Sequence, residues 1–194
     1  DLGIATDGDA DRLGVVDDLG RYLHANDILV ILYYYLLKYK GWIGPCVRNV
    51  ATTHMLDKVA ASFGQECYEV PVGFKHISKA MAEHGAVIGG ESSGGLTVEG
   101  HIHGKDGIYA GMLLIEMVAV TGKKLSKIWE ELLEEYGYHG WEERSYSFPA
   151  EDKEKLRNLL YVSRELPDFE RPVEMVSYLD GCKVLFPDGA WVLA

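Results

Sequence analysis

Short β-type runs alternate with helical segments through the middle of this chain of 194 residues. Strands joined through helices of ten or more residues typically pair in parallel, as in βαβ units. The alternation therefore predicts the α/β fold class, with a parallel-type mixed sheet flanked by helices. The expected strands are 46–51, 66–70 and 86–90, and the expected helices are 28–39, 53–64, 76–85, 106–121 and 125–136. Asp27 is the expected N-cap of the first helix.

The segments on either side of this region differ from it in composition and in their expected secondary structure. Before it, two strands flank an acidic loop; after it, a Gly- and Tyr-rich link leads to a strand, a charged helix and further strands. We therefore expect three parts, in which the outer two are partial α+β segments: residues 1–21, 22–136 and 137–194. The chain does not begin with Met, which suggests a fragment of a longer protein. The flanking elements are expected at 1–6, 12–18, 144–148 and 150–161, with Asp-Gly turns at 180–181 and 188–189.

Charge and cysteine content exclude several classes of protein. The chain has 19 basic and 30 acidic residues, a net charge of −11, which argues against a nucleic-acid or anionic-membrane partner. Its longest apolar run, 28–37, is about ten residues, whereas a membrane span takes ~20. The three cysteines have no metal-binding spacing, and reduced thiols in a cytoplasmic protein without a signal peptide are the simplest interpretation.

The acidic loop carries the first chemical signal. Asp7, Asp9 and Asp11 follow an apolar run and precede Arg12. Carboxylates this close repel one another unless a cation compensates, and oxygen ligands suit Mg²⁺ or Ca²⁺. A solvated turn remains an alternative, as does a Mg²⁺-dependent aspartyl phosphatase with Asp7 as nucleophile. An EF-hand is excluded, because Arg12 stands where that loop requires Gly and the flanks are strands.

Three polar or Gly-rich loops follow the three middle strands: residues 52–54, 71–76 and 90–95. Because the carboxyl ends of parallel strands meet at one edge, these loops are expected to lie together. In the third loop, Glu91 can accept hydrogen bonds from vicinal sugar hydroxyls and Ser93 can donate one. A plain Gly-rich turn is the alternative there. For Lys75 and His76 in the second loop, simple solvent exposure is the stronger interpretation.

A further polar segment, residues 100–111, precedes an apolar helix. His101 and His103 alternate, but no third soft ligand accompanies them, so a histidine metal site is disfavoured. Lys105 stands just before Asp106 at the expected helix start. A lysine in this place can serve as a cation for phosphate or as a proton carrier.

Taken together, these motifs resemble those of the α-D-phosphohexomutase superfamily, the phosphoglucomutases and phosphomannomutases. "TDGDADR" is similar to its metal loop and "GESSGG" to its sugar-specificity loop, while "PVGFKH" and "HIHGKDG" are similar to the flanking segments. The resemblance covers residues 1 to about 136 in the family's order. It implies a four-domain enzyme that moves a phosphoryl group between C1 and C6 of a hexose through a phosphoserine and a bisphosphate intermediate. Residues 1–21 would then end domain 2, 22–136 form domain 3 and 137–194 begin domain 4.

The resemblance also implies roles for individual residues and for cofactors. Mg²⁺ would be the metal, hexose phosphate the substrate and glucose 1,6-bisphosphate the activator of the parent enzyme. Phosphoryl transfer depends mostly on positioning and charge neutralisation, which a metal, an arginine and a lysine supply. The expected metal ligands are Asp7, Asp9 and Asp11; the expected catalytic residues are Arg12, Lys105 and His101; the expected substrate-binding residues are Glu91, Ser93, Gly94 and Lys75.

One departure bears on the substrate. Some family members end the sugar loop in His, where this chain has Gly95, which favours glucose phosphate over a dual glucose/mannose specificity. The phosphoserine loop and the phosphate loop of the outer domains have no counterpart among these 194 residues. We therefore expect no mutase turnover from this chain alone. A non-catalytic module that binds metal or sugar phosphate is the alternative from a different class.

Overall fold

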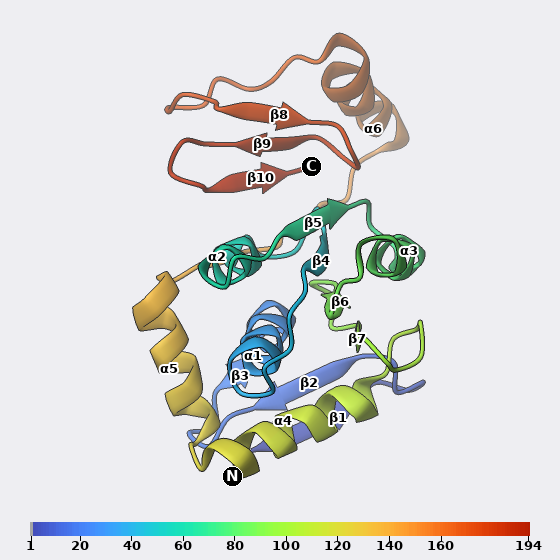
Figure 1. Cartoon of the computed structure of the whole chain (residues 1–194). Coiled ribbons are helices and arrows are strands. Elements are labelled where there is room, and N and C mark those ends of the chain that lie inside the picture. The colour runs from blue at the N-terminus through green and yellow to red at the C-terminus, as the bar shows by residue number, and fades with distance from the viewer. Residues whose placement is uncertain (1) are drawn as a thin grey trace. The chain divides into compact units, whose positions relative to one another are not determined.

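A computed structural model describes residues 2–194 and divides the chain into two units, one ending at His139 and one spanning Gly140–Ala194. Figure 1 gives the element labels. The first unit contains all the residues for which the sequence predicts a function. Each unit is described by itself.

The first unit is built around a four-stranded mixed sheet in the order β5-β4-β6-β7. β4 (Cys46–Asn49) pairs in parallel with β5 (Cys67–Val70) on one side and with β6 (Ile88–Gly90) on the other. β7 (Leu96–Val98) is antiparallel to β6. The predicted parallel-type mixed sheet is confirmed, with β7 as a strand that the sequence did not indicate.

Helices cover both faces of this sheet (Figure 1). α1 (Ala25–Lys38) and α2 (Met55–Ser62) lie on one face and α3 (Phe74–His84) on the other. Successive residues of β4 point to opposite faces, since strand side chains alternate. Cys46 accordingly belongs to the large core cluster with α1 and α2, whereas Val47 belongs to a smaller cluster with Ile77 of α3.

The start of α1 differs from the prediction. His24, and not Asp27, is the N-cap residue: its Nδ1 accepts from the backbone N–H of Asn26 at 3.2 Å. Asp27 lies in the first turn and accepts from the backbone N–H of His24 at 3.1 Å, so the two residues form a capping box. The prediction was wrong because histidine is an uncommon cap and Asp is a common one.

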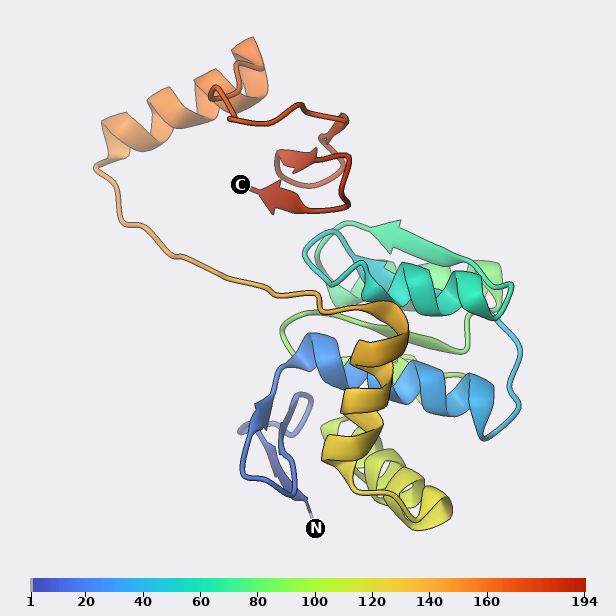
Figure 2. The ribbon, with the colours of Figure 1, turned by 90° about the vertical axis from the view of Figure 1, so that its left-hand side faces the viewer.

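A second, antiparallel sheet precedes α1 in the order β1-β2-β3. α4 (Gly107–Thr121) packs against its first two strands, and α5 (Leu125–Tyr136) contacts α1 and α2. α5 is the gold helix in Figure 2. The strands are β1 (Gly3–Thr6), β2 (Leu13–Val16) and β3 (Tyr22–Leu23).

The second unit contains α6 (Ala150–Arg157), a π-helical turn over Asn158–Ser163 and a three-stranded antiparallel sheet in the order β10-β9-β8. Its strands are β8 (Met175–Ser177), β9 (Lys183–Leu185) and β10 (Trp191–Leu193). The predicted strand at 144–148 is absent from the described structure, where these residues form neither helix nor strand. None of the helices formed by residues 2–194 is long and apolar enough to cross a membrane.

Candidate metal and hexose-phosphate site

The acidic loop connects β1 to β2 as the turn of a hairpin, with Thr6 and Leu13 paired in the last rung. Carboxylate oxygens of Asp7, Asp9 and Asp11 lie within 4.8 Å of one another, and no other group of three potential ligands lies this close among residues 2–194. Oδ1 of Asp11 is buried and accepts no hydrogen bond from residues 2–194, although the Nε of Arg12 lies 3.5 Å away. A buried carboxylate oxygen without a hydrogen bond is costly, so the loop fits a hard divalent cation.

Arg12 holds the loop in shape through Asp7. Its backbone N–H donates to Asp7 Oδ1 at 3.1 Å, and its guanidinium Nε donates to Asp7 Oδ2 at 2.6 Å. Burial works to raise the pKa of Asp7, but these hydrogen bonds outweigh it and the pKa is lowered. Both carboxylate oxygens of Asp7 therefore have a donor within the loop, and Asp7 is ionised at neutral pH.

Lys105 supplies a second cation to the loop. Its ammonium forms an ion pair with Asp11 Oδ2. On the way there, the aliphatic part of the side chain crosses Gly95: a Cβ built on Gly95 would lie 2.1 Å from Lys105 Cδ. The Lys105 side chain therefore packs across the sugar loop at Gly95 and ends at the acidic loop.

Backbone contacts join the acidic loop to the sugar loop and to α4. The N–H of Leu13 donates to the carbonyl of Gly94 at 3.3 Å, and an isolated antiparallel bridge pairs Arg12 with Gly95. The N–H of Gly107, the first residue of α4, donates to the carbonyl of Ala10 at 3.0 Å. Gly94 has a φ of +102°, a conformation that side chains with a Cβ rarely adopt. The two predicted loops therefore form one continuous site.

Glu91 begins the sugar loop and is buried, with 8% of its surface exposed. Its Oε1 accepts from Asn49 Nδ2 at 3.2 Å and from the backbone N–H of Gly73 at 3.0 Å. Its Oε2 has no hydrogen bond to any other residue within 2–194. The carboxylate is thus held on one side and has acceptor capacity on the other.

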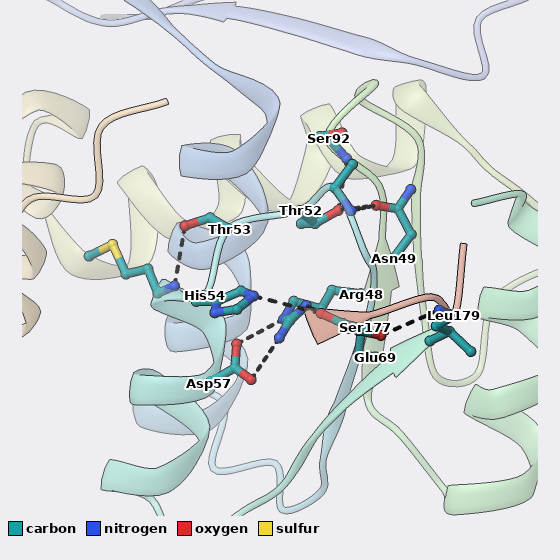
Figure 3. A network of polar contacts seen from close by, with 12 residues as sticks. Arg48, Asn49, Thr52, Thr53, His54, Asp57, Glu69, Ser92, Ser177 and Leu179 are labelled. Atoms are coloured by element: carbon teal, nitrogen blue, oxygen red, sulfur yellow. Dashed lines mark hydrogen bonds and ion pairs between the residues drawn. The ribbon is translucent and has the colours of Figure 1, made fainter. Parts of the chain in front are cut away.

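Asn49 and Thr52 complete the connection between the loops. Thr52 lies in the predicted polar loop 52–54, but the sequence indicated no role for either side chain. Asn49 Oδ1 accepts from the Thr52 hydroxyl at 2.8 Å, and the backbone N–H of Ser92 donates to Thr52 Oγ1 at 3.1 Å (Figure 3). With the Glu91 contacts, these bonds join the loops after β4, β5 and β6, as predicted for the carboxyl ends of parallel strands. Asn49 at the end of a strand, three residues before Thr52, was the available signal.

His101 is part of the same region, although it does not touch the acidic loop. Its Nε2 lies 2.8 Å from Asp106 Oδ2, and its ring stacks on Tyr109 with centroids 4.0 Å apart. Asp106 Oδ1 caps α4 by accepting from the Tyr109 N–H at 2.8 Å. This N–H bond, and then His101, lower the pKa of Asp106.

Two predicted substrate residues have no hydrogen bond or ion pair to the rest of the site in the described chain. Ser93 is exposed at the tip of the sugar loop, and Lys75 is exposed in the first turn of α3. Both lie near residues that the network holds, since Ser93 follows Ser92 and Lys75 follows Gly73 by two positions. Their side chains are free to meet a ligand from solvent.

An ionic cluster around one buried arginine lies beside this network, and no pattern in the sequence indicated it. Arg48, with 4% of its side chain exposed, donates to Asp57 at 2.8 and 2.9 Å and to Glu69 (Figure 3). Burial works to lower the pKa of Arg48, but Asp57 and Glu69 outweigh it and raise the pKa. The cluster ties β4 to β5 and to α2 next to Asn49.

The comparisons with known proteins agree with this arrangement. A family model described as phosphoglucomutase/phosphomannomutase, alpha/beta/alpha domain III, matches residues 24–136. The chain belongs to this family, within the α-D-phosphohexomutase superfamily. The matched phosphohexomutase domain III includes α1 to α5 and the whole sugar loop. The resemblance read from the motifs is therefore confirmed, whereas the roles of the individual residues stay predictions.

Relatives of this phosphohexomutase chain carry more than one name. A "Phosphoglucomutase/phosphomannomutase" of Thermococcus kodakarensis is 29% identical over 100% of this chain and 40% of its own length. A "Phosphoglucosamine mutase" of Carboxydothermus hydrogenoformans is 38% identical over 68% of this chain and 30% of its own length. A solved structure of a phosphomannomutase-like protein from Thermus thermophilus has a TM-score of 0.77 and 34% identity, and covers 99% of this chain and 39% of that one. The chain thus spans about two fifths of the length of relatives that match all of it.

Proposed function

We propose that this chain forms the metal- and hexose-binding part of a phosphoglucomutase, an enzyme that interconverts hexose 1-phosphate and hexose 6-phosphate. The observation that carries the proposal is the joining of the acidic loop to the sugar loop through Leu13, Gly94 and the Arg12–Gly95 bridge. A phosphoryl group and a sugar ring that are covalently linked require binding sites that are adjacent in this way. Turnover by the whole protein, through a phosphoserine, is part of the proposal.

Mg²⁺ is the proposed metal, with Asp7, Asp9 and Asp11 as its ligands. When bound, it would neutralise charge on the phosphoryl group. The fit rests on the three clustered carboxylates and on the buried Oδ1 of Asp11, which accepts no hydrogen bond from the described residues. Arg12, whose side chain is 51% exposed, is the proposed phosphate contact, because its guanidinium has donors beyond the one that Asp7 uses.

The sugar would be held by the loop that begins at Glu91. Glu91 Oε2 is the proposed acceptor for the hydroxyls at C3 and C4, and the exposed Ser93 hydroxyl the proposed donor. Gly94 would give the backbone close access, and the exposed Lys75 in the first turn of α3 is a further proposed contact. The geometry of the loop and the family to which the chain belongs support these assignments.

Proton transfer is proposed for Lys105, with His101 as its neighbour. Lys105 lies between the sugar loop and the acidic loop, so its ammonium can donate a proton to the sugar oxygen at which the phosphoryl group departs. His101 is fixed by Asp106 and Tyr109, two residues that begin the same helix. The phosphatase alternative, with Asp7 as the nucleophile, is disfavoured because the chain matches a phosphoglucomutase/phosphomannomutase family model over residues 24–136.

Glucose phosphate is the proposed substrate because Gly95 provides no side chain at the end of the sugar loop. Glucosamine phosphate is the second candidate, since the relatives include "Phosphoglucosamine mutase" at 38% identity. Mannose phosphate, with an inverted C2, is the third. A cytoplasmic location and the glucose 1,6-bisphosphate activator belong to the same proposal.

The test is calorimetric binding of glucose 1-phosphate, glucosamine 1-phosphate and mannose 1-phosphate to the purified protein in Mg²⁺. Glu91→Gln should weaken binding of the preferred sugar about tenfold, a loss of ~1.4 kcal/mol. The control is Lys79→Ala on the exposed side of α3, where the lysine forms an ion pair with Glu83 in the same helix. Equal binding by wild type and Glu91→Gln, or no binding of any of the three, would overturn the proposal.

A further inference from the structure

Two thiols lie side by side on one face of the central sheet, on the neighbouring strands β4 and β5. Cys46 is the first residue of β4 and Cys67 the first of β5, and the parallel register pairs them directly. Paired residues on neighbouring strands point to the same face of a sheet. Both cysteines are free. The sequence, in which they are far apart, shows no sign of this pairing.

The two thiols differ in their access to solvent. Cys46 is 1% exposed and lies in the core beneath α1, whereas Cys67 is partly exposed on β5, the edge strand of the sheet. Burial raises the pKa of the Cys46 thiol, and the neighbouring Cys67 raises it further. A reagent from solvent therefore meets the Cys67 thiol first, while the Cys46 thiol is buried next to it.

We propose that Cys46 and Cys67 form a reversible disulfide when the protein meets a peroxide, with Cys67 as the reacting thiol and Cys46 as the resolving thiol. Neighbouring strands lie about 4.8 Å apart, which falls within the Cα separation of about 4.4–6.8 Å that disulfides require. The Cβ atoms of a disulfide lie about 3.8 Å apart, so the edge strand must move inward by roughly 1 Å. A bond formed under such strain is easily reduced.

The chemistry uses two thiols and one peroxide. The Cys67 thiolate attacks one peroxide oxygen, the O–O bond breaks, and the other oxygen leaves and is protonated; Cys67 becomes a sulfenic acid. The Cys46 sulfur then attacks the sulfenic sulfur, the S–O bond breaks, and the departing hydroxide takes the Cys46 proton to form water. The peroxide is reduced to water and the two thiols are oxidised to a disulfide. A dithiol reverses the reaction by exchange.

The bond would fasten the edge strand of the sheet. β5 is paired only with β4, and its other side carries no strand in the described structure. Cross-linking its first residue to β4 removes the local opening through which the edge amides exchange with solvent. Amide exchange in β5 is therefore a second readout that a change at one thiol alone does not produce.

The experiment treats the purified protein with hydrogen peroxide under native conditions, then unfolds it, alkylates the free thiols and maps the peptides by mass spectrometry. The expected product is a Cys46–Cys67 linked peptide, two hydrogens lighter than the separate peptides, which dithiothreitol reverses. Cys182, buried in the second unit, should stay reduced during the peroxide treatment and then be alkylated, so it serves as the internal control. Hydrogen exchange of β5 amides should slow in the oxidised protein.

Single variants separate the two roles. Cys46→Ala should leave Cys67 to proceed to sulfinic acid, and Cys67→Ala should leave Cys46 reduced. The proposal is overturned if the wild-type protein yields oxidised Cys67 without the linked peptide, or if neither thiol reacts before Cys182. Because the decisive peptide is sought in the wild-type protein, a variant that fails to fold does not affect the result.

Discussion

The side chain of Lys105 occupies the space that a side chain on Gly95 would need, since a Cβ there would lie 2.1 Å from Lys105 Cδ. The lysine can reach Asp11 only because the sugar loop has no side chain at this point. A histidine at residue 95 would therefore be incompatible with the observed position of the Lys105 side chain. The substrate preference proposed from Gly95 and the proton transfer proposed for Lys105 depend on each other.

Lys105→Ala should raise the affinity of the protein for Mg²⁺. The Lys105 ammonium and the metal compete for the same Asp11 carboxylate, and a partly exposed ion pair is worth up to ~1 kcal/mol, which corresponds to about fivefold in affinity. Asp11→Asn should change the affinity in the opposite direction. Mg²⁺ titration calorimetry measures both, with Lys79→Ala as the control. Unchanged affinity in Lys105→Ala would show that the lysine and the metal do not share Asp11.

Thr52→Val should destabilise the protein by ~1–3 kcal/mol, the cost of buried polar groups that lose their partner. Valine has the shape of threonine but neither donates to Asn49 nor accepts from the Ser92 N–H. Urea unfolding measures the loss. The matched control is Thr121→Val, where the hydroxyl bonds to Met117 in its own helix. A Thr52→Val protein within about 0.5 kcal/mol of wild type would contradict the prediction.

Asp27→Asn should stabilise the protein at neutral pH and not in acid. Burial raises the pKa of Asp27 to about 6 from 3.8, although its hydrogen bond from His24 acts in the opposite direction. Between these values the folded protein keeps a proton that the unfolded chain releases, so stability falls as pH rises, by roughly 2–3 kcal/mol in total. Asparagine can accept the same hydrogen bond without a charge.

Urea unfolding of wild type and Asp27→Asn across this pH interval measures the effect. The free energy of unfolding of the variant should rise relative to that of wild type as the pH increases from 3.8 to about 6. Above that interval the difference should stay constant. An advantage that does not change with pH would exclude Asp27 as its source. Asp152→Asn is the control, because Asp152 lies in the exposed helix α6 and pairs with Lys155.

Much of the fold could be predicted from sequence because helix and strand periodicities differ and glycines mark the ends. β3 was missed because a strand of two residues is too short to show a period. β7 was missed because its place in the sheet comes from pairing with β6, which its own three residues do not indicate. The expected strand at 144–148 was wrong for the opposite reason. Its residues alternate suitably, but a strand also needs a neighbour to pair with, and alternation does not report one.

The candidate site was predictable where its residues are consecutive. The acids at 7, 9 and 11 and the loop that begins at Glu91 are local motifs, and local spacing is what a sequence displays. The pairing of Lys105 with Asp11 and the hydrogen bond from Asn49 to Glu91 join elements that are distant in the chain. Such contacts depend on how helices and sheets cross, which no single segment encodes.

The first residue of α4 is also a glycine, and a Cβ on Gly107 would lie 2.6 Å from the backbone oxygen of Arg12. At Gly95 the atoms that a Cβ would meet belong to the Lys105 side chain, whereas at Gly107 they belong to the backbone of the acidic loop. A larger residue at Gly107 would push the acidic loop outward, and one at Gly95 would displace Lys105. The missing methyl group of Gly107 therefore sets how closely the start of α4 can approach the three clustered carboxylates.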